Sequence, residues 1–149
     1  MKTILAAVDF SPVTARVIGE ASSLAAATGA GVQLLHVVEP AEAYVPVGAA
    51  MDVITAPMPL DPPDLGAVKA RLEELAAPLR ASGITVGTKA VIDIPAEGIL
   101  AAAGSSGASM IVLGSHGHGA VYQLFAGSVV TAVLHRTSIP VTVIPAHAA

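Results

Sequence analysis

The sequence predicts an α/β domain in which an open, parallel five-stranded sheet is covered by helices on both faces. Five short apolar stretches alternate along the chain with four stretches in which apolar residues recur every three or four positions. The first pattern is typical of buried strands and the second of helices packed on a sheet. Such alternation implies parallel strands joined by right-handed crossovers. The 149 residues are 54% hydrophobic, mainly alanine and valine, and 3% aromatic, which indicates one domain with a core of small side chains.

The first strand is predicted at Thr3 to Val8, where nearly every residue is apolar. A short turn follows, in which Ser11 is suited to cap the next helix and Pro12 to occupy its first position. The glycine at Gly29 ends this helix. The buried face of the helix is predicted from its spacing to contain Val13, Val17, Ala21 and Leu24.

A second strand is predicted at Val32 to Val38, and a long proline-rich loop at about 41–63. Proline interrupts helices and is excluded from central strands because it has no backbone N–H. Loops of this length are uncommon in compact domains and are usually functional or mobile. The prolines of this stretch are Pro46, Pro57, Pro59, Pro62 and Pro63.

The second helix, Leu65 to Leu79, is the clearest element, because its apolar residues are spaced alternately by three and four and charged residues lie between them. The stretch from Ile84 to Ile92 alternates apolar with polar or small residues, which favours an edge strand. A short third helix is predicted at Ala96 to Ala103, although Gly98 weakens it. The remaining elements are a strand at Met110 to Leu113, a helix that ends near Arg136, and a strand at Pro140 to Ile144.

The composition argues against a membrane protein and a secreted protein. Mean hydropathy is high at +0.74, but glycine and serine interrupt every apolar run before the ~18 residues of a spanning helix. The apolar run from Ile4 to Val8 meets Asp9 too early for a signal peptide. The chain has no cysteine, which agrees with a reducing compartment. We therefore expect a cytoplasmic protein without membrane contact.

Other functional classes are also disfavoured. The net charge is −4 and the seven basic residues are scattered, so no nucleic-acid partner is expected. The pair His116 and His118 lacks further ligands, so no metal site is predicted. The stretch from Gly114 to Gly117 does not fit the G-x-S-x-G pattern of serine hydrolases, and no catalytic residue is assigned.

A candidate ligand site lies between Met110 and Ser128, where a buried strand leads into a glycine-rich loop and a helix start. Glycines let a ligand approach the backbone closely, and a helix start presents unpaired N–H groups that bind phosphate. Ligands of such sheets bind beyond the carboxyl ends of the strands, where the strand order reverses. The turn that begins at Asp9 is the second candidate for this position, and both loops would form one site if they flank the reversal.

The phosphate-binding groups of this site would be backbone N–H and hydroxyl groups. No lysine follows Lys89, and the G-x-x-x-x-G-K-[ST] pattern is absent from the sequence. Tyr122 stands where a dinucleotide-binding G-x-G-x-x-G motif would require its third glycine. A site without a phosphate-binding lysine is poorly suited to fast phosphoryl transfer. We therefore expect ligand binding without rapid turnover.

The glycine-rich stretch resembles the nucleotide-binding signature of the universal stress protein family. The spacing of Gly114, Gly117 and Gly127-Ser128 is G, two residues, G, nine residues, G-[S/T]. Three other segments are similar in the same order along the chain: VDFS at 8–11, LLHVV at 34–38 and IPVTVIP near the C-terminus. The resemblance covers essentially all 149 residues, as one universal stress protein domain.

The resemblance implies a Rossmann-like, adenine nucleotide alpha hydrolase-like sheet of strand order 3-2-1-4-5. It also implies an adenine nucleotide, ATP or a relative, with or without Mg²⁺, a homodimer formed through Val141 to Ile144, and a role as a cytoplasmic stress sensor or regulator. Asp9 and the Val37 backbone would meet the adenine, and the glycines and Ser128 would hold ribose and phosphates, with an N–H donated by Val129. The full set of binding residues implied is Ala7, Asp9, Val37, Gly114, Ser115, His116, Gly117, Gly127, Ser128 and Val129.

Two alternatives stay open. ATP-binding relatives often have a hydroxyl residue at the position of Val130. Valine cannot make the phosphate or metal contact that such a hydroxyl would provide. The protein could thus be a family member that binds no nucleotide and acts through protein contacts. The other alternative is a slow ATPase that uses the same site with Mg²⁺ bridging the phosphates, so at most weak ATP hydrolysis is expected.

Overall fold

The computed structural model describes residues 1–47, 54–115 and 129–146. The main sheet is parallel, and its strands lie in the order β5-β2-β1-β6-β7. Among these five strands, counted along the chain, the order is the predicted 3-2-1-4-5, so the predicted fold class is confirmed. The strands are β1 (Thr3–Ala7), β2 (Gly31–Val38), β5 (Val86–Ile92), β6 (Ala108–Gly114) and β7 (Val141–Ile144).

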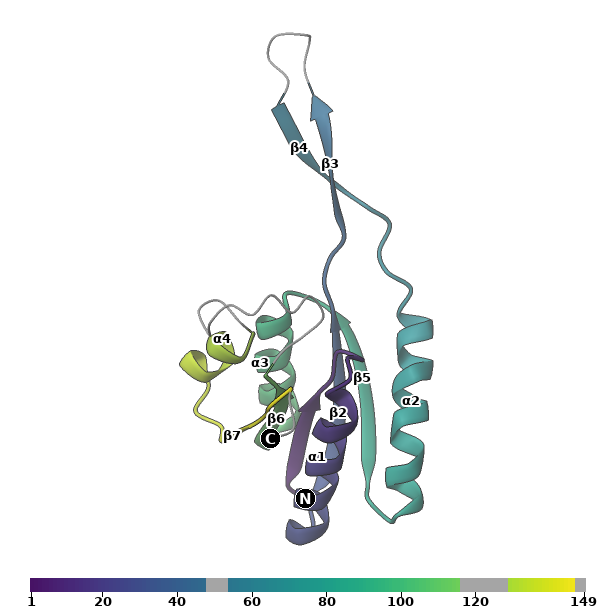
Figure 1. Ribbon diagram of the computed structural model, residues 1–149, viewed down its shortest axis with the longest axis vertical. Coiled ribbons are helices and arrows are strands. Elements are labelled where there is room, and N and C mark those ends of the chain that lie inside the picture. Colours follow the sequence, from purple (N-terminus) through teal and green to yellow (C-terminus); the bar gives the residue numbers. More distant parts are fainter. Residues whose placement is uncertain (48–53, 116–128, 147–149) are drawn as a thin grey trace.

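Helices cover both faces of the sheet (Figure 1). The pair α1 (Thr14–Thr28) and α2 (Leu65–Ala81) packs on one face, and the pair α3 (Pro95–Ser106) and α4 (Val129–Arg136) packs on the other. Successive strand residues point to opposite faces. In β1, Ile4 and Ala6 accordingly belong to the α1/α2 core, while Leu5 between them belongs to the α3/α4 core.

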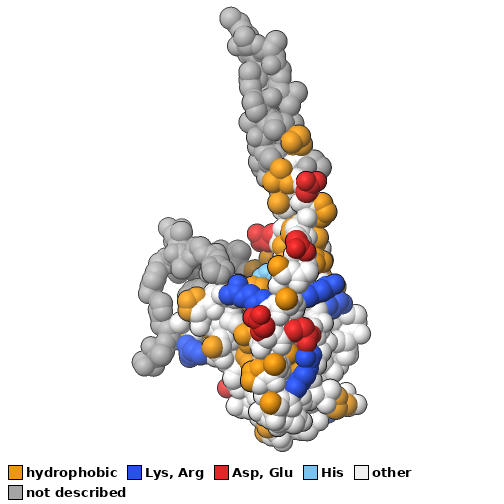
Figure 2. Space-filling model, turned by 90° about the vertical axis from the view of Figure 1, so that its right-hand side faces the viewer, with side chains coloured by type: hydrophobic (Ala, Val, Ile, Leu, Met, Phe, Trp, Pro, Cys, Tyr) orange, Lys and Arg blue, Asp and Glu red, His pale blue; other side chains and the backbone are white. Residues whose placement is uncertain are grey.

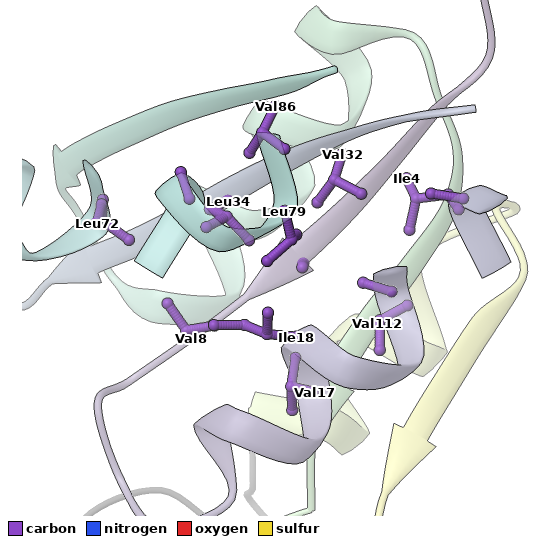
Figure 3. Close-up of a cluster of buried hydrophobic side chains, with 14 of the residues drawn as sticks. Ile4, Val8, Val17, Ile18, Val32, Leu34, Leu72, Leu79, Val86 and Val112 are labelled. Atoms are coloured by element: carbon purple, nitrogen blue, oxygen red, sulfur yellow. The ribbon is translucent and has the colours of Figure 1, made fainter. Parts of the chain in front are cut away.

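The α1/α2 core consists of aliphatic side chains that meet between the two helices and the sheet (Figure 3). Leu34 of β2 and Leu72 of α2 are both 0% exposed. Ala21 and Ala76 are also fully buried, and their small side chains allow both helices to lie close to the strands. The outer face of α2 mixes acidic and basic side chains (Figure 2). None of the helices in the described ranges is long and apolar enough to cross a membrane.

The start of α1 differs from the prediction. The helix begins at Thr14, and neither Ser11 nor its nominal cap residue, Val13, provides a side-chain cap. Instead, Oδ1 of Asp9 accepts a hydrogen bond of 3.0 Å from the Ser11 N–H. The prediction failed because Phe10 adopts a left-handed conformation, with φ of 60°, and the chain makes a turn before it becomes helical. The turn is therefore closed by the Asp9 carboxylate.

The prediction of a long loop at 41–63 was wrong. Two strands in this stretch, β3 (Glu42–Val47) and β4 (Ile54–Pro59), form an antiparallel hairpin that projects from the domain (Figure 1). The N–H of Leu60 donates to the carbonyl of Ala41 at 3.3 Å, which makes this pair a hydrogen-bonded one. Hydrogen-bonded and non-hydrogen-bonded pairs alternate along an antiparallel ladder.

The register places all three strand prolines in non-hydrogen-bonded pairs. Pro46 is paired with Thr55, Pro57 with Tyr44 and Pro59 with Glu42, so each proline is an odd number of steps from the bonded pair. At such positions the backbone N–H would point away from the partner strand, and the ladder loses nothing when it is missing. The exclusion of proline holds for central strands, but it does not hold for a ribbon with two open edges.

The first prediction concerns Glu73, which joins α2 to β5. Hydrogen bonds from Arg80, and then from the Thr88 hydroxyl, lower the pKa of Glu73 from 4.5 to about 2. The ionised carboxylate therefore stabilises the folded state fully above pH 4.5, and this contribution is lost as the pH falls toward 2. Thermal unfolding should show Glu73→Gln less stable than the wild type near neutral pH, with the difference shrinking steadily below the ordinary carboxyl pKa.

The neighbouring Glu74→Gln variant is the matched control, because it removes an equal charge from the same helix turn while Glu73 keeps its bonds to Arg80. A stability difference for Glu73→Gln that is the same at every pH would show that the ionised carboxylate is not the stabilising species.

Candidate ligand-binding site

A cavity of about 390 Å³ opens at the carboxyl ends of β1, β2 and β6, beside the first turns of α1, α3 and α4. This volume is in the range of small-molecule sites. From β1 the chain passes to β2 on one side, whereas β6 lies on the other side of β1, so the strand order reverses here. The cavity therefore occupies the position at which open α/β sheets bind ligands. Its lining residues are Ala7, Val8, Asp9, Val13, Thr14, Val17, Leu35, His36, Val37, Val38, Glu39, Pro95, Ile99, Leu113, Gly114 and Val129.

The two loops that the sequence singled out do lie together in the structure. The cavity lining includes five predicted residues: Ala7, Asp9, Val37, Gly114 and Val129. Ser115 does not line it, because its hydroxyl accepts from the Ala146 N–H at 3.0 Å, while its own N–H donates to the Ile144 carbonyl at 2.8 Å. The other four predicted residues, His116, Gly117, Gly127 and Ser128, lie outside the described residues. The binding roles of all ten remain predictions.

Asp9 has both a structural role and an available oxygen. Its Oδ1 accepts from the Ser11 N–H at 3.0 Å and from the Thr14 hydroxyl at 3.5 Å, which closes the turn before α1. Within the described part of the chain, Oδ2 of Asp9 has no such partner. Because Asp9 lines the cavity and is partly exposed, this oxygen is available to accept a hydrogen bond from a ligand.

The Val37 backbone is directed toward the cavity. The β1 ladder ends at Ala7, opposite Leu35, and the N–H of Val8 still donates to the Leu35 carbonyl at 2.9 Å. Backbone groups of every second residue point to the same side of a strand, so the N–H and C=O of Val37 also point to the β1 side. There β1 has already ended, and Val37 offers one donor and one acceptor to the cavity.

Sequence reasoning missed the apolar wall that α3 contributes. Pro95 and Ile99 are four residues apart and lie on one face of the first turns of this helix, next to Leu35 and Leu113 in the cavity lining. The helix approaches β2 closely because Gly98 has no side chain, and a Cβ there would lie 2.8 Å from a methyl of Val37. The sequence did contain an indication of this wall: Gly98 lies inside an otherwise helical stretch. We interpreted it as a weakness of the helix, but it marks a position of close packing.

The cavity wall carries negative charge. Asp9 and Glu39 are its ionisable carboxylates, and no lysine or arginine is among the described lining residues. The nearby arginines have other contacts: Arg16 donates to the Pro145 carbonyl, Arg71 lies over the Phe10 ring, and Arg136 pairs with Glu97. The last pair fixes the end of α4 to α3 and holds the pKa of the Glu97 carboxyl below its usual range.

Val130 has a packing role. Its side chain is 6% exposed and belongs to the α3/α4 core, whereas Val129 before it is 37% exposed and lines the cavity. Residue 130 therefore contributes an apolar contact to the core and has no hydroxyl to offer a phosphate or metal. Among the described residues of α4, Val129 is thus the one that lines the cavity.

The fold and the position of the cavity define an α/β domain with a ligand site at the reversal of strand order. A family model, the universal stress protein family, matches residues 1–145. The chain therefore belongs to the universal stress protein family, as the sequence predicted. The comparison with curated proteins gave no match.

Solved structures show the same fold. Hypothetical protein MJ0577 is 21% identical, with alignment over 99% of this chain and 98% of that chain and a TM-score of 0.75. A universal stress protein in complex with cAMP is 21% identical, with coverage of 96% and 95% and a TM-score of 0.68. The Archaeoglobus fulgidus universal stress protein in complex with dAMP is 22% identical, with coverage of 97% of each chain and a TM-score of 0.63.

The second prediction tests the packing role of Gly114. A Cβ at this position would lie 2.6 Å from Cγ1 of Val13, so we expect Gly114→Ala to destabilise the fold by about 1–3 kcal/mol through overpacking. Val13→Ala removes the obstructing methyl groups. In a double-mutant cycle, Gly114→Ala should cost clearly less in the Val13→Ala background, as measured by chemical denaturation.

Gly104→Ala in α3 is the matched control, because no atom lies within 4 Å of the added Cβ and its φ is not in the left-handed region. This helical substitution should stabilise the protein by roughly 0.5–1 kcal/mol. Equal costs of Gly114→Ala in both backgrounds would rule out the contact with Val13 as the reason for glycine at 114.

Proposed function

We propose that this protein binds an adenine nucleotide in the cavity and acts as a nucleotide-dependent regulator in the stress response. The observation that carries the proposal is the convergence of Asp9 and the Val37 backbone on one cavity at the reversal of strand order. Structural relatives in complex with cAMP and dAMP support the choice of adenine nucleotides.

The described residues fit the nucleoside part of such a ligand. The apolar side chains of Leu35, Pro95 and Ile99 suit a flat base. The edge of adenine offers a donor and an acceptor that match the C=O and N–H of Val37, and the second N–H of its amino group can donate to Asp9. The phosphates would extend toward the predicted glycine loop, past Gly114 and the N–H of Val129.

The negative charge of the wall opposes the binding of phosphate groups. Asp9 and Glu39 repel phosphate, and the sequence has no lysine or arginine between Glu97 and Arg136 to offset them. A triphosphate therefore needs a divalent cation such as Mg²⁺ to reduce its charge. A slow ATPase on the same site is the second candidate, because that cation would also polarise the phosphates.

The proposal includes a homodimer in the cytoplasm. The strand β7 is at the edge of the sheet, so its outer backbone groups have no neighbouring strand in the described chain. Its Val141 and Val143 are only partly buried. An open edge of this kind pairs readily with another strand, and two-fold pairing of Val141 to Ile144 between two copies would cover both edges.

The third prediction tests the proposal through Asp9. Asp9→Asn keeps an Oδ1 acceptor for the turn but removes the charge and one acceptor oxygen, so the fold should be retained. Loss of a hydrogen bond to a charged group should weaken adenosine binding by about ten- to a hundredfold in calorimetry. Glu20→Gln, an exposed charge change on α1, should bind like the wild type. Absence of adenosine, AMP and ATP binding at millimolar concentration in the wild type would refute the proposed function.

The fourth prediction concerns the cation. Without metal, ATP should bind more weakly than adenosine by about tenfold, since the repulsion acts between charges only a few ångströms apart. Addition of Mg²⁺ should strengthen ATP binding and leave adenosine binding unchanged. Phosphate release measured in the same samples tests the alternative, and several turnovers per minute would favour the ATPase.

A further inference from the structure

The ladder between β1 and β2 ends in an unusual hydrogen bond. The N–H of Val8 donates to the Leu35 carbonyl at 2.9 Å. In a regular parallel pair the next bond would run from the Val37 N–H to the Val8 carbonyl. Among the described residues, that carbonyl accepts instead from Nδ1 of His36, at 2.7 Å. Because a carbonyl oxygen only accepts, the hydrogen is on Nδ1. A carbonyl oxygen can accept two hydrogen bonds, but among the described residues the Val8 carbonyl accepts none from the Val37 N–H, so the imidazole stands in place of that ladder bond.

The imidazole of His36 is held in this position by two further side chains. The Phe10 ring stacks on it, with centroids 4.4 Å apart and planes inclined by 30°. The guanidinium carbon of Arg71 lies 4.2 Å from the centroid of the Phe10 ring. A cation over an aromatic face stabilises the arrangement, and here it joins α2, the turn after β1, and β2.

Val37 itself is fixed from the opposite face of the sheet. A Cβ added to Gly98 would lie 2.8 Å from one of the Val37 methyl groups, so α3 packs directly on this side chain. This packing restrains Val37 on the α3 face of the sheet. With the Val8 carbonyl held by His36, the Val37 N–H remains directed at the cavity beside its own C=O.

We propose that His36 is a positioning residue for the base: its hydrogen bond holds the Val8 carbonyl toward the imidazole and away from the Val37 N–H, which is left to donate to adenine. The inference rests on the proposed function. Adenine presents an acceptor at N1 and a donor at its amino group, whereas hypoxanthine presents a donor at N1 and an acceptor oxygen. A free N–H at a fixed position therefore selects adenine over hypoxanthine, because hypoxanthine would leave it facing another donor.

The test compares AMP with IMP in calorimetric titrations of three proteins. The wild type should prefer AMP by about tenfold or more, as expected for a site with one mismatched buried hydrogen bond. In His36→Leu the Val8 carbonyl becomes free to accept from Val37, so the preference for AMP should fall to about twofold or less. His36→Asn supplies a side-chain N–H near the position of Nδ1 and should restore the preference.

A matched pair on α2 tests the same ring without a change in the strand. Arg71→Gln removes the cation over Phe10 and should reduce the AMP preference by about threefold, whereas exposed Lys69→Gln should leave it unchanged. This pair decides the question if His36→Leu does not fold.

The outcomes separate the inference from the proposed function. If His36→Leu loses the same factor of affinity for AMP and for IMP, the AMP preference is kept. His36 then does not position the donor, and the inference is overturned while nucleotide binding stands. An unchanged preference in Arg71→Gln, in the absence of a folded His36→Leu, overturns it as well. If the wild type binds neither AMP, IMP nor ATP, the proposed function itself fails.

Discussion

The cavity exists because β1 ends before its neighbour β2. The central strand stops at Ala7, and the chain turns away at Phe10, whereas β2 continues to Val38 with β5 beside it. The last residues of β2 therefore have a partner strand on one side only. Their free backbone groups face a space that α3 and α4 close from one side of the sheet. Asp9, which begins the turn, is placed beside those groups by the same early ending of the strand.

Close approach of helices to the sheet gives this space its walls. Gly114 lets the start of α1 approach β6 at Val13, and Gly98 lets α3 approach β2 at Val37. A side chain at Gly114 would collide with Val13, and one at Gly98 would collide with Val37, so this close packing requires glycine. The glycines of the site thus act partly through packing, in addition to any contact with a ligand. Binding defects of glycine variants here have to be judged against their stability.

The alternation of apolar stretches was sufficient to predict the five-stranded sheet and its helices, because burial on both faces imposes continuous apolar runs. The edge position of β5 followed from its mixed apolar and polar residues, since an edge strand is less completely buried. The alternation also brought Asp9 and Gly114 to one place. The sequence could not reveal the hydrogen bond of His36 to Val8. This bond depends on the exact residue at which the β1–β2 ladder ends, and a shift of one residue would remove it. The start of α1 was missed because the left-handed conformation of Phe10 is rare for a side chain of its size. The hairpin was missed because proline was judged by its effect in central strands.

The hairpin β3–β4 has two edges that differ in their capacity to pair with other strands. On β4, Pro57 and Pro59 occupy two successive outward positions, so this edge offers carbonyls but lacks two donors in a row. On β3, the outward positions begin with Glu42 and Tyr44, which both retain an N–H, and only Pro46 lacks one. Uncontrolled sheet growth needs two open edges, one for each incoming strand. With two successive donors missing from the β4 edge, this hairpin is poorly suited to extend a sheet on both sides, so the proline spacing limits edge-to-edge pairing of the projecting arm.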